Sequence, residues 1–240
     1  MSAVPAVLPP STSPRVVLKR GMVGHEVYVL QVLLNDLTTG KAKLGEDGHF
    51  GAKTESKVRG LQKTERITQD GIAGLDTQRR LALRALKKAE AVAKLPTGLL
   101  RGIMENESGY VVGSANWSVP GGVDVALMQE RVYTADYGDA ARWREAMGLG
   151  GVIDAARTLR EAYDRLHGLP GATTAKRAWE LAALNHNYPY GADQIARGHG
   201  LSTAPKAWVQ AIRVPGVDSP AEWAEFYIGK VTPYVKDWTV

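Results

Sequence analysis

The stretch Asp47-Gly48-His49-Phe50-Gly51-Ala52-Lys53-Thr54 recurs 23 residues later as Asp70-Gly71-Ile72-Ala73-Gly74-Leu75-Asp76-Thr77, with four of eight positions identical. An Asp-Gly pair favours a tight turn, because Asp can accept a hydrogen bond from the backbone ahead of it and Gly adopts positive φ without strain. Thr54 and Thr77 are then expected to be the N-caps of the helices that follow. The repeat therefore predicts two similar turns, each leading into a helix.

Apolar residues on both sides of the first turn follow helical spacing. Before it, intervals of three and four separate Val27, Leu30, Leu33, Leu34 and Leu37. After it, one helical face carries Val58 and Leu61. Residues 77–94 are rich in Ala, Leu, Arg and Lys, which favour helices, and Pro96 interrupts the run. The sequence predicts a three-helix module over residues 14–82, a helical linker over 83–95 and a second domain over 96–240.

Charge and aromatic residues are distributed unevenly along the chain. Residues 1–95 hold 16 Lys and Arg against 9 Asp and Glu, whereas residues 96–240 hold 14 against 16. A basic region attracts anionic wall polymers and nucleic acid alike. Only Tyr28 and Phe50 are aromatic before residue 96, and this scarcity of stacking residues argues against a nucleic-acid partner. All six Trp follow residue 100, which predicts a large core or a sugar cleft in the second half.

Composition excludes several classes of site. The chain has no cysteine, so it has no disulfide bond, no thiolate zinc site and no cysteine nucleophile. No apolar stretch approaches the roughly 20 residues of a membrane helix, and membrane insertion is not expected. Residues 1–13 are rich in Pro, Ser and Ala and lack the pattern of a secretory signal, so we expect a disordered tail and synthesis in the cytoplasm without a signal peptide.

The second half contains one carboxylate in a distinctive setting. An amphipathic helix is predicted from Leu99, Leu100, Ile103 and Met104, and it carries Glu105 and Glu107 before Gly109. Two residues apart on a helix, these carboxylates point to different faces, so only one can lie toward the core. A partly apolar pocket keeps a carboxylic acid protonated closer to neutral pH, which cleavage of a glycosidic bond requires.

Three short motifs follow one another in this half. They are Glu107-Ser108-Gly109-Tyr110, Ala126-Leu127-Met128-Gln129 and Asn185-His186-Asn187-Tyr188. Each is weak alone, and their order and spacing make the combination specific.

The first half resembles the peptidoglycan-binding-domain-like family, whose members are small three-helix modules. The resemblance rests on the Asp-Gly repeat together with Leu18-Lys19-Arg20-Gly21, Leu30-Gln31 and Leu61-Gln62. It implies peptidoglycan as the partner, with Asp47, His49 and Asp70 as candidate wall contacts. Phe50 is either a further wall contact or a core residue that shapes the turn.

The second half resembles the soluble lytic transglycosylases and goose-type lysozymes, whose motifs are Glu-Ser-Gly-aromatic, Gly-Leu-Met-Gln and Tyr-Asn in that order. This resemblance implies an all-helical lysozyme-like domain in which Glu107 protonates the leaving glycosidic oxygen and then acts as a base. The implied substrate-binding residues are Ser108, Tyr110, Met128, Gln129, His186, Asn187 and Tyr188. Two positions depart from the family pattern, since Ala126 stands in place of Gly and His186 in place of Tyr.

The segment 111–125 adds two candidates. Trp117 is expected either to stack on a sugar ring or to clasp the loop. Asp124 can serve as the second carboxylate of a hydrolytic lysozyme if it lies across the sugar from Glu107, and otherwise it shapes a turn after two glycines. The distance between the carboxylates decides between these roles.

The combined pattern predicts a mainly α fold and resembles a modular phage endolysin. Such a protein acts as a monomer on the cell wall, without metal or cofactor, and cleaves the β-1,4 bond between N-acetylmuramic acid and N-acetylglucosamine. One clear carboxylate favours lytic transglycosylation, which leaves a 1,6-anhydromuramoyl end. The alternatives are a hydrolytic muramidase or chitinase-like glycosidase, and a non-catalytic wall-binding or virion structural protein.

Overall fold

A computed structural model of the chain describes residues 17–38, 42–116, 122–199, 201, 217 and 219–239. The chain forms two compact units, and each combines two stretches of sequence. The first unit comprises Met1–Ala89 and Glu107–Asp154, and the second comprises Glu90–Asn106 and Ala155–Val240. The boundaries of these units differ from those of the predicted domains, 14–82 and 96–240. The segment Glu107–Asp154 is grouped with the N-terminal module rather than with the rest of the second half. The expected tail over 1–13 lies outside the described residues.

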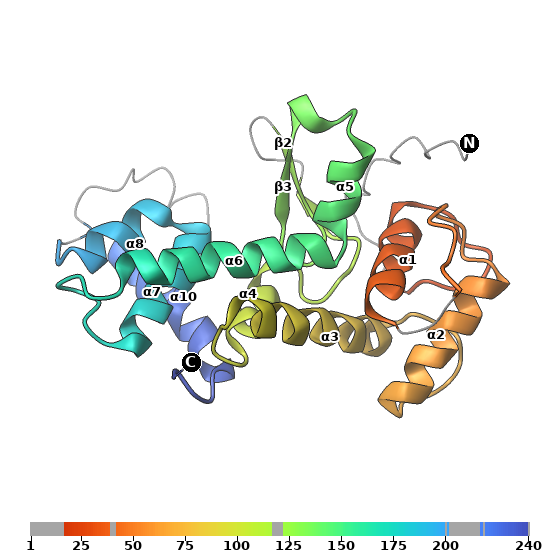
Figure 1. Ribbon diagram of the computed structural model, residues 1–240, viewed down its shortest axis with the longest axis horizontal. Coiled ribbons are helices and arrows are strands. Elements are labelled where there is room, and N and C mark those ends of the chain that lie inside the picture. The colour runs from red at the N-terminus through yellow and green to blue at the C-terminus, as the bar shows by residue number, and fades with distance from the viewer. Residues whose placement is uncertain are drawn as a thin grey trace. The chain divides into compact units, whose positions relative to one another are not determined.

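The module contains the three helices that the sequence predicts. They are α1 (His25–Leu37), α2 (Ala52–Glu65) and α3 (Leu75–Ala93), in red to yellow in Figure 1. Most predicted core positions are at most 2% exposed, namely Val27, Leu30, Leu33, Leu34, Val58 and Leu61. The residues assigned to a helical linker, 83–95, lie mostly within α3.

The first repeated turn is organised by Gln31, a residue of α1 that is 1% exposed. Its Nε2 donates to Asp47 Oδ1 (2.9 Å) and to the carbonyl oxygen of His49 (3.0 Å). Its Oε1 accepts from the backbone N–H of Gly48 (2.9 Å). Gly48 has φ of +71°, as an Asp-Gly turn requires. One buried side chain therefore binds three consecutive residues of the turn.

Gln62 on α2 organises the second turn in the same way. Its Nε2 donates to Asp70 Oδ1 (2.7 Å) and to the carbonyl oxygen of Ile72 (3.0 Å), and its Oε1 accepts from the N–H of Gly71 (2.9 Å). Gly71 has φ of +75°. The repeat in sequence is thus a repeat in structure, and we call each arrangement a glutamine clamp.

The threonines of the repeat belong to these clamps. The prediction that Thr54 and Thr77 are N-caps is wrong, because α2 begins at Ala52 after the N-cap Gly51, and α3 begins at Leu75. Both threonines are instead buried inside the first helical turn. The hydroxyl of Thr54 accepts from Gln31 (3.2 Å) and that of Thr77 from Gln62 (3.0 Å).

A small antiparallel sheet corrects the expectation of an all-helical second half. Its strands are β1 (Ala115–Asn116), β2 (Gly122–Val125) and β3 (Glu130–Tyr133), in the order β1-β2-β3. Val123, Val125 and Val132 are fully buried, as expected when alternate residues of a strand face the core. The fold nevertheless remains mainly α, as predicted.

Helix α5 (Ala140–Met147) packs against both β3 and α1 (Figure 1). Its Arg144 contacts the Glu46 carboxylate at 2.8 and 2.9 Å and Asp36 at 2.9 Å. These hydrogen bonds, to Glu46 first and then to Asp36, hold the pKa of Arg144 above its ordinary value. Asp36 also accepts from the N–H of Leu149 (3.1 Å). The arginine therefore joins the segment after Glu107 to the module.

The second unit is built mainly from helices. After α6 (Leu149–Leu166) come α7 (Ala175–Asn187), α8 (Pro189–Ala196) and α10 (Pro220–Val231). Thr174 caps α7, and Ser219 and Glu222 form a capping box at the start of α10. Within the described part of the chain, no helix is both long and apolar enough to cross a membrane.

Candidate functional site

Glu107 is the last residue of α4 (Leu99–Glu107). The predicted apolar face is correct, because Leu99, Leu100, Ile103 and Met104 are all fully buried. Glu105 is exposed, whereas Glu107 is half-buried. The helix therefore distinguishes the two carboxylates in the way that their spacing predicts.

A buried carboxylate, Glu90, holds the first turn of α4. Its Oε1 accepts from the N–H groups of Gly98 (3.0 Å) and Leu100 (3.1 Å), which would otherwise lack partners at a helix start. Burial raises the pKa of Glu90 to about 7, although these two hydrogen bonds act in the opposite direction. This role could not be predicted, because Glu90 lies in a run of Ala, Leu, Arg and Lys that is typical of a solvated helix.

The middle of α4 lies directly against the end of α10. A Cβ placed on Gly102 would come within 2.6 Å of the carbonyl oxygen of Val231, so only glycine permits this approach. One residue earlier, the guanidinium of Arg101 lies over the ring of Tyr234 at 5.1 Å. Together with Glu90, these contacts fix the helix that ends at Glu107.

The backbone turns sharply after Glu107. Gly109 and Tyr110 both have positive φ, +55° and +69°, and this conformation is strained for Tyr110. Tyr110 is 4% exposed, and the guanidinium of Arg79 lies 5.1 Å from its ring centroid. The hydroxyl oxygen of Ser108 is buried without a hydrogen-bond partner among the described residues.

The second motif, Ala126-Leu127-Met128-Gln129, forms the loop that joins β2 to β3. Ala126 and Gln129 have φ of +60° and +52°, which explains why the family pattern has Gly at the position of Ala126. Gln129 is half-buried, and its Nε2 donates to the carbonyl oxygen of Ala126 (2.8 Å). Met128 is only 2% exposed, so it is a core residue and does not offer its side chain to a substrate.

Backbone hydrogen bonds connect the first two motifs. Val111 donates to the carbonyl of Ser108 (3.1 Å), Ser114 donates to that of Val111 (3.1 Å), and Ala126 donates to that of Ser114 (2.8 Å). Five non-glycine residues of the described chain have positive φ, and three of them, Tyr110, Ala126 and Gln129, lie in these motifs. Strained backbone of this kind gathers at functional sites.

Asp124 is occupied by a partner on the neighbouring strand. It lies opposite Arg131 in the β2–β3 register, and the guanidinium of Arg131 binds both of its carboxylate oxygens, Oδ2 at 3.0 Å. The hydrogen bond to Asp124 holds the pKa of Arg131 above its ordinary value. A bidentate ion pair is the role that the structure gives Asp124.

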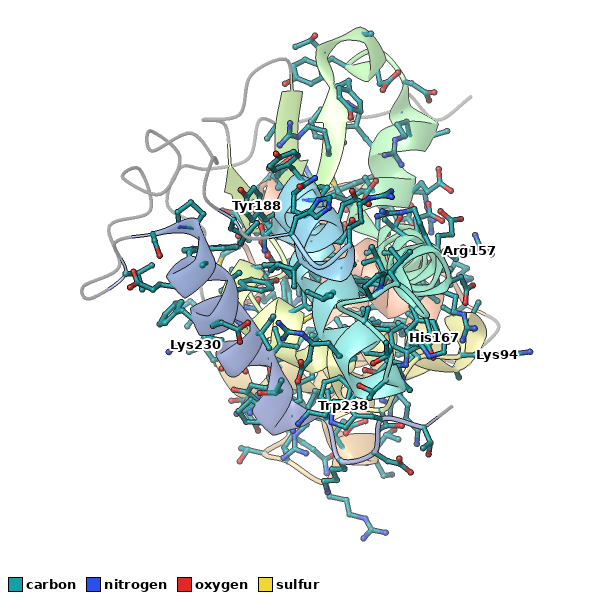
Figure 2. All side chains as sticks on the ribbon, turned by 90° about the vertical axis from the view of Figure 1, so that its left-hand side faces the viewer. Lys94, Arg157, His167, Tyr188, Lys230 and Trp238 are labelled. Carbon is teal, nitrogen blue, oxygen red and sulfur yellow. The ribbon has the colours of Figure 1, made fainter. Side chains whose placement is uncertain are left out.

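The third motif belongs to the second unit. His186 and Asn187 are half-buried and end α7, and Tyr188 separates that helix from α8 (Figure 2). Tyr188 is 8% exposed, and its ring meets Trp223 edge-on at 6.2 Å. Burial, followed by the proximity of Tyr190, raises the pKa of Tyr188.

The candidate wall contacts of the module divide into structural and exposed residues. Phe50 is 1% exposed and belongs to the core, which corrects its assignment as a wall contact. Asp47 and Asp70 serve the glutamine clamps. For Asp47, hydrogen bonds from Gln31 and from the His49 N–H outweigh the effect of burial and lower the pKa. For Asp70, the bonds from the Ile72 N–H and from Gln62 lower it. His49 is exposed and stays a candidate.

Two further points concern Trp117 and metal ligands. Trp117 lies outside the described residues. Within the described ranges, no three His, Asp or Glu side chains lie together as metal ligands would.

Comparison with known proteins bears on the module. Residues 23–81 match the family described as "Putative peptidoglycan binding domain". The module is a domain of this type.

Two curated proteins of Bacillus licheniformis are similar to parts of the chain. A "Probable N-acetylmuramoyl-L-alanine amidase" is 40% identical over 83 residues, which cover 35% of this chain and 22% of that protein. The N-acetylmuramoyl-L-alanine amidase CwlL is 33% identical over 98 residues, 38% of this chain and 27% of the relative. The chain thus spans about a quarter of the length of these relatives.

Proposed function

We propose that the chain binds peptidoglycan through its module and cleaves the glycan strands with Glu107. The observation that carries this proposal is the setting of Glu107, a half-buried carboxylate at the end of a firmly held helix. It directly precedes a strained turn that is hydrogen-bonded onward to the second motif. Cleavage of the bond between N-acetylmuramic acid and N-acetylglucosamine requires one group that first donates and then accepts a proton.

In the proposed reaction, Glu107 protonates the glycosidic oxygen as the bond to the muramoyl C1 breaks. The positive charge that develops on the sugar is then quenched by the 6-hydroxyl of the same muramoyl residue. Glu107, now a carboxylate, takes the proton of that hydroxyl, which restores the acid and leaves a 1,6-anhydro end. This route needs no second carboxylate, in agreement with the ion pair that engages Asp124.

The remaining motif residues have substrate-positioning roles in this proposal. The Gln129 side chain keeps a carbonyl oxygen and one N–H beyond its bond to Ala126, and these can meet a sugar hydroxyl or an N-acetyl group. Ser108 and Tyr110 follow Glu107 directly in the chain and shape its surroundings, and the family resemblance implies substrate contacts for His186, Asn187 and Tyr188. Residues 14–82 hold the wall and residues 96–240 cut it, so tethering raises the local concentration of the bond to be cleaved. The protein would then act at the cell wall as a monomer.

A second candidate reaction comes from the names of the relatives. An N-acetylmuramoyl-L-alanine amidase cuts the amide between the muramoyl lactyl group and the stem peptide, and leaves the glycan intact. The chain shares only about a quarter of the length of these proteins, so their activity is the alternative rather than the conclusion.

Digestion of purified sacculi separates the candidates. Glycan cleavage releases soluble muropeptides in which each muramoyl residue still carries its stem peptide. Amidase activity instead releases free peptides with a new L-alanine amino group, and its appearance without new glycan ends would contradict the proposal. Sacculi that are bound and left uncut would identify a non-catalytic wall-binding protein.

A further inference from the structure

A pocket of about 210 Å³ opens on the module, away from the repeated turns. Four lining residues come from one face of α2, and the others come from the end of α1 and from α3. The lining consists of Thr38, Lys57, Gly60, Leu61, Thr64 and Arg84. Leu61 belongs to the motif Leu61-Gln62, and the other five lining residues lie outside the sequence motifs.

The pocket contains two cations. The ammonium group of Lys57 donates to the side-chain oxygen of Asn35 (2.9 Å) and to the carbonyl of Ala42 (3.2 Å), both neutral acceptors. No carboxylate partner of Lys57 occurs in the described part of the chain, and a third donor is left over. Burial and the nearby charge of Lys43 lower the pKa of Lys57, so an anion beside it would relieve both effects. Arg84 pairs with Glu65 through Nε, and its other N–H groups extend the donor set.

The same pocket also offers hydrogen-bond acceptors. The hydroxyl of Thr38 donates to the carbonyl of Leu34, and that of Thr64 donates to the carbonyl of Gly60 (2.9 Å). Because both protons are directed to the backbone, the hydroxyl oxygens are left as acceptors. Leu61 also lines the pocket, but at 2% exposed it is a core residue and offers little surface to a ligand.

We propose that this pocket binds a carboxylate-bearing stem peptide of peptidoglycan. The cations suit the carboxylate, and the hydroxyl oxygens suit amide N–H groups. A polyol phosphate, the other anionic polymer of walls, has no amide N–H to match the hydroxyls. The inference rests on the proposed wall binding and names its ligand.

Gly60 provides a clean way to close the pocket. A Cβ at this position would meet no atom within 4 Å, so a larger side chain has room. Glycine inside an exposed helix is less favourable than leucine, because it gives the unfolded chain more conformational freedom. The substitution Gly60→Leu therefore favours the fold while it fills the pocket.

The test uses the full-length chain with Glu107→Gln, to prevent digestion during binding. Affinity for purified sacculi is measured for this protein and after adding Lys57→Met, Gly60→Leu or, as the control, Lys63→Met. Lys63 is an exposed lysine of the same helix that lies outside the pocket lining. We expect Lys57→Met and Gly60→Leu each to weaken binding about tenfold and Lys63→Met to change it less than about twofold.

Soluble probes identify the ligand. The peptide L-Ala-γ-D-Glu-L-Lys-D-Ala should bind, and its fully amidated form should lose about tenfold in affinity. Unchanged binding of sacculi after Lys57→Met and Gly60→Leu would overturn the pocket assignment while leaving wall binding intact. Binding of a glycerol phosphate polymer in place of the peptide would overturn the choice of ligand. A parent protein that does not bind sacculi at all would contradict the proposed function itself.

Discussion

The module and the region around Glu107 use short sequence motifs in opposite ways. In the module, a buried glutamine binds the Asp, the first Gly and the Thr of each repeat. The motifs that begin at Glu107 instead contain strained backbone, at Tyr110, Ala126 and Gln129. The helix that ends at Glu107 starts on a buried acid, Glu90, whose pKa is raised. The contrast teaches that the first motif encodes a fold, whereas the second keeps features that folding alone does not favour.

The largest effect is expected at Glu107. Replacement by Gln keeps the shape of the side chain but removes the proton, so the rate of glycan cleavage should fall about 100-fold or more, with little change in the unfolding temperature. The matched control is Glu105→Gln on the exposed face of the same helix, which should retain activity. Equal activity of the two variants, measured as release of soluble muropeptides, would show that Glu107 is not the acid.

Substitutions in the glutamine clamps are expected to lower stability rather than catalysis. Gln31→Leu leaves the Gly48 N–H and the Asp47 carboxylate without their partner, and the free energy of unfolding should fall by about 3 kcal/mol. Gln62→Leu should behave alike, while Gln69→Leu at an exposed position should change little. Denaturant titration, followed by the loss of helical structure, measures this change in the free energy of unfolding. A clamp variant as stable as the parent protein would break the comparison.

Glu90 should make stability depend on pH. Its pKa is raised from 4.5 to about 7 in the folded chain, so the protonated form favours folding, and the stability that it contributes below pH 4.5 is lost as the pH rises through 7. Glu90→Gln stays neutral and can still accept from Gly98 and Leu100. At pH 8 the variant should be more stable than the parent by up to about 3 kcal/mol, and at pH 4 the two should be equal. Thermal unfolding at both pH values would reveal a constant difference if burial of Glu90 had no such effect.

The smallest effect is expected at Ala126. Its φ of +60° costs about 1–2 kcal/mol for a residue with a Cβ, and glycine removes this strain but gives the unfolded chain more freedom. Ala126→Gly should therefore stabilise the first unit by about 0.5–1 kcal/mol. Ala141→Gly, within helix α5, serves as the contrasting control and should destabilise by a similar amount. Destabilisation by Ala126→Gly would mean that the loop is not strained.

Much of the helical fold could be predicted from sequence because intervals of three and four are a local property. The turns at Gly48 and Gly71 were predictable for the same reason. The glutamine clamps were not, since Gln31 and Asp47 are 16 residues apart and meet only through packing. A signal was present, however, because both clamp glutamines follow a core leucine.

The sheet was missed because its strands are short. The alternation of Val123, Asp124 and Val125 covers too few residues to distinguish a strand from a loop, and the preceding glycines favour a turn. Without the register, the pairing of Asp124 with Arg131 could not be foreseen, and Asp124 stayed a candidate catalytic group. Glu107 could be singled out because its helix, its spacing from Glu105 and its motif are all local.

The central claim is cleavage by a single carboxylate, and the mass of the new muramoyl ends tests it most directly. Purified sacculi are digested with the parent protein, and the released muropeptides are analysed by mass spectrometry before and after borohydride reduction. Transglycosylation predicts ends that are lighter by one water than reducing ends and that do not react with borohydride. Reducible muramoyl ends of full mass would contradict the account and would require a second group, with Asp124 the first to be re-examined.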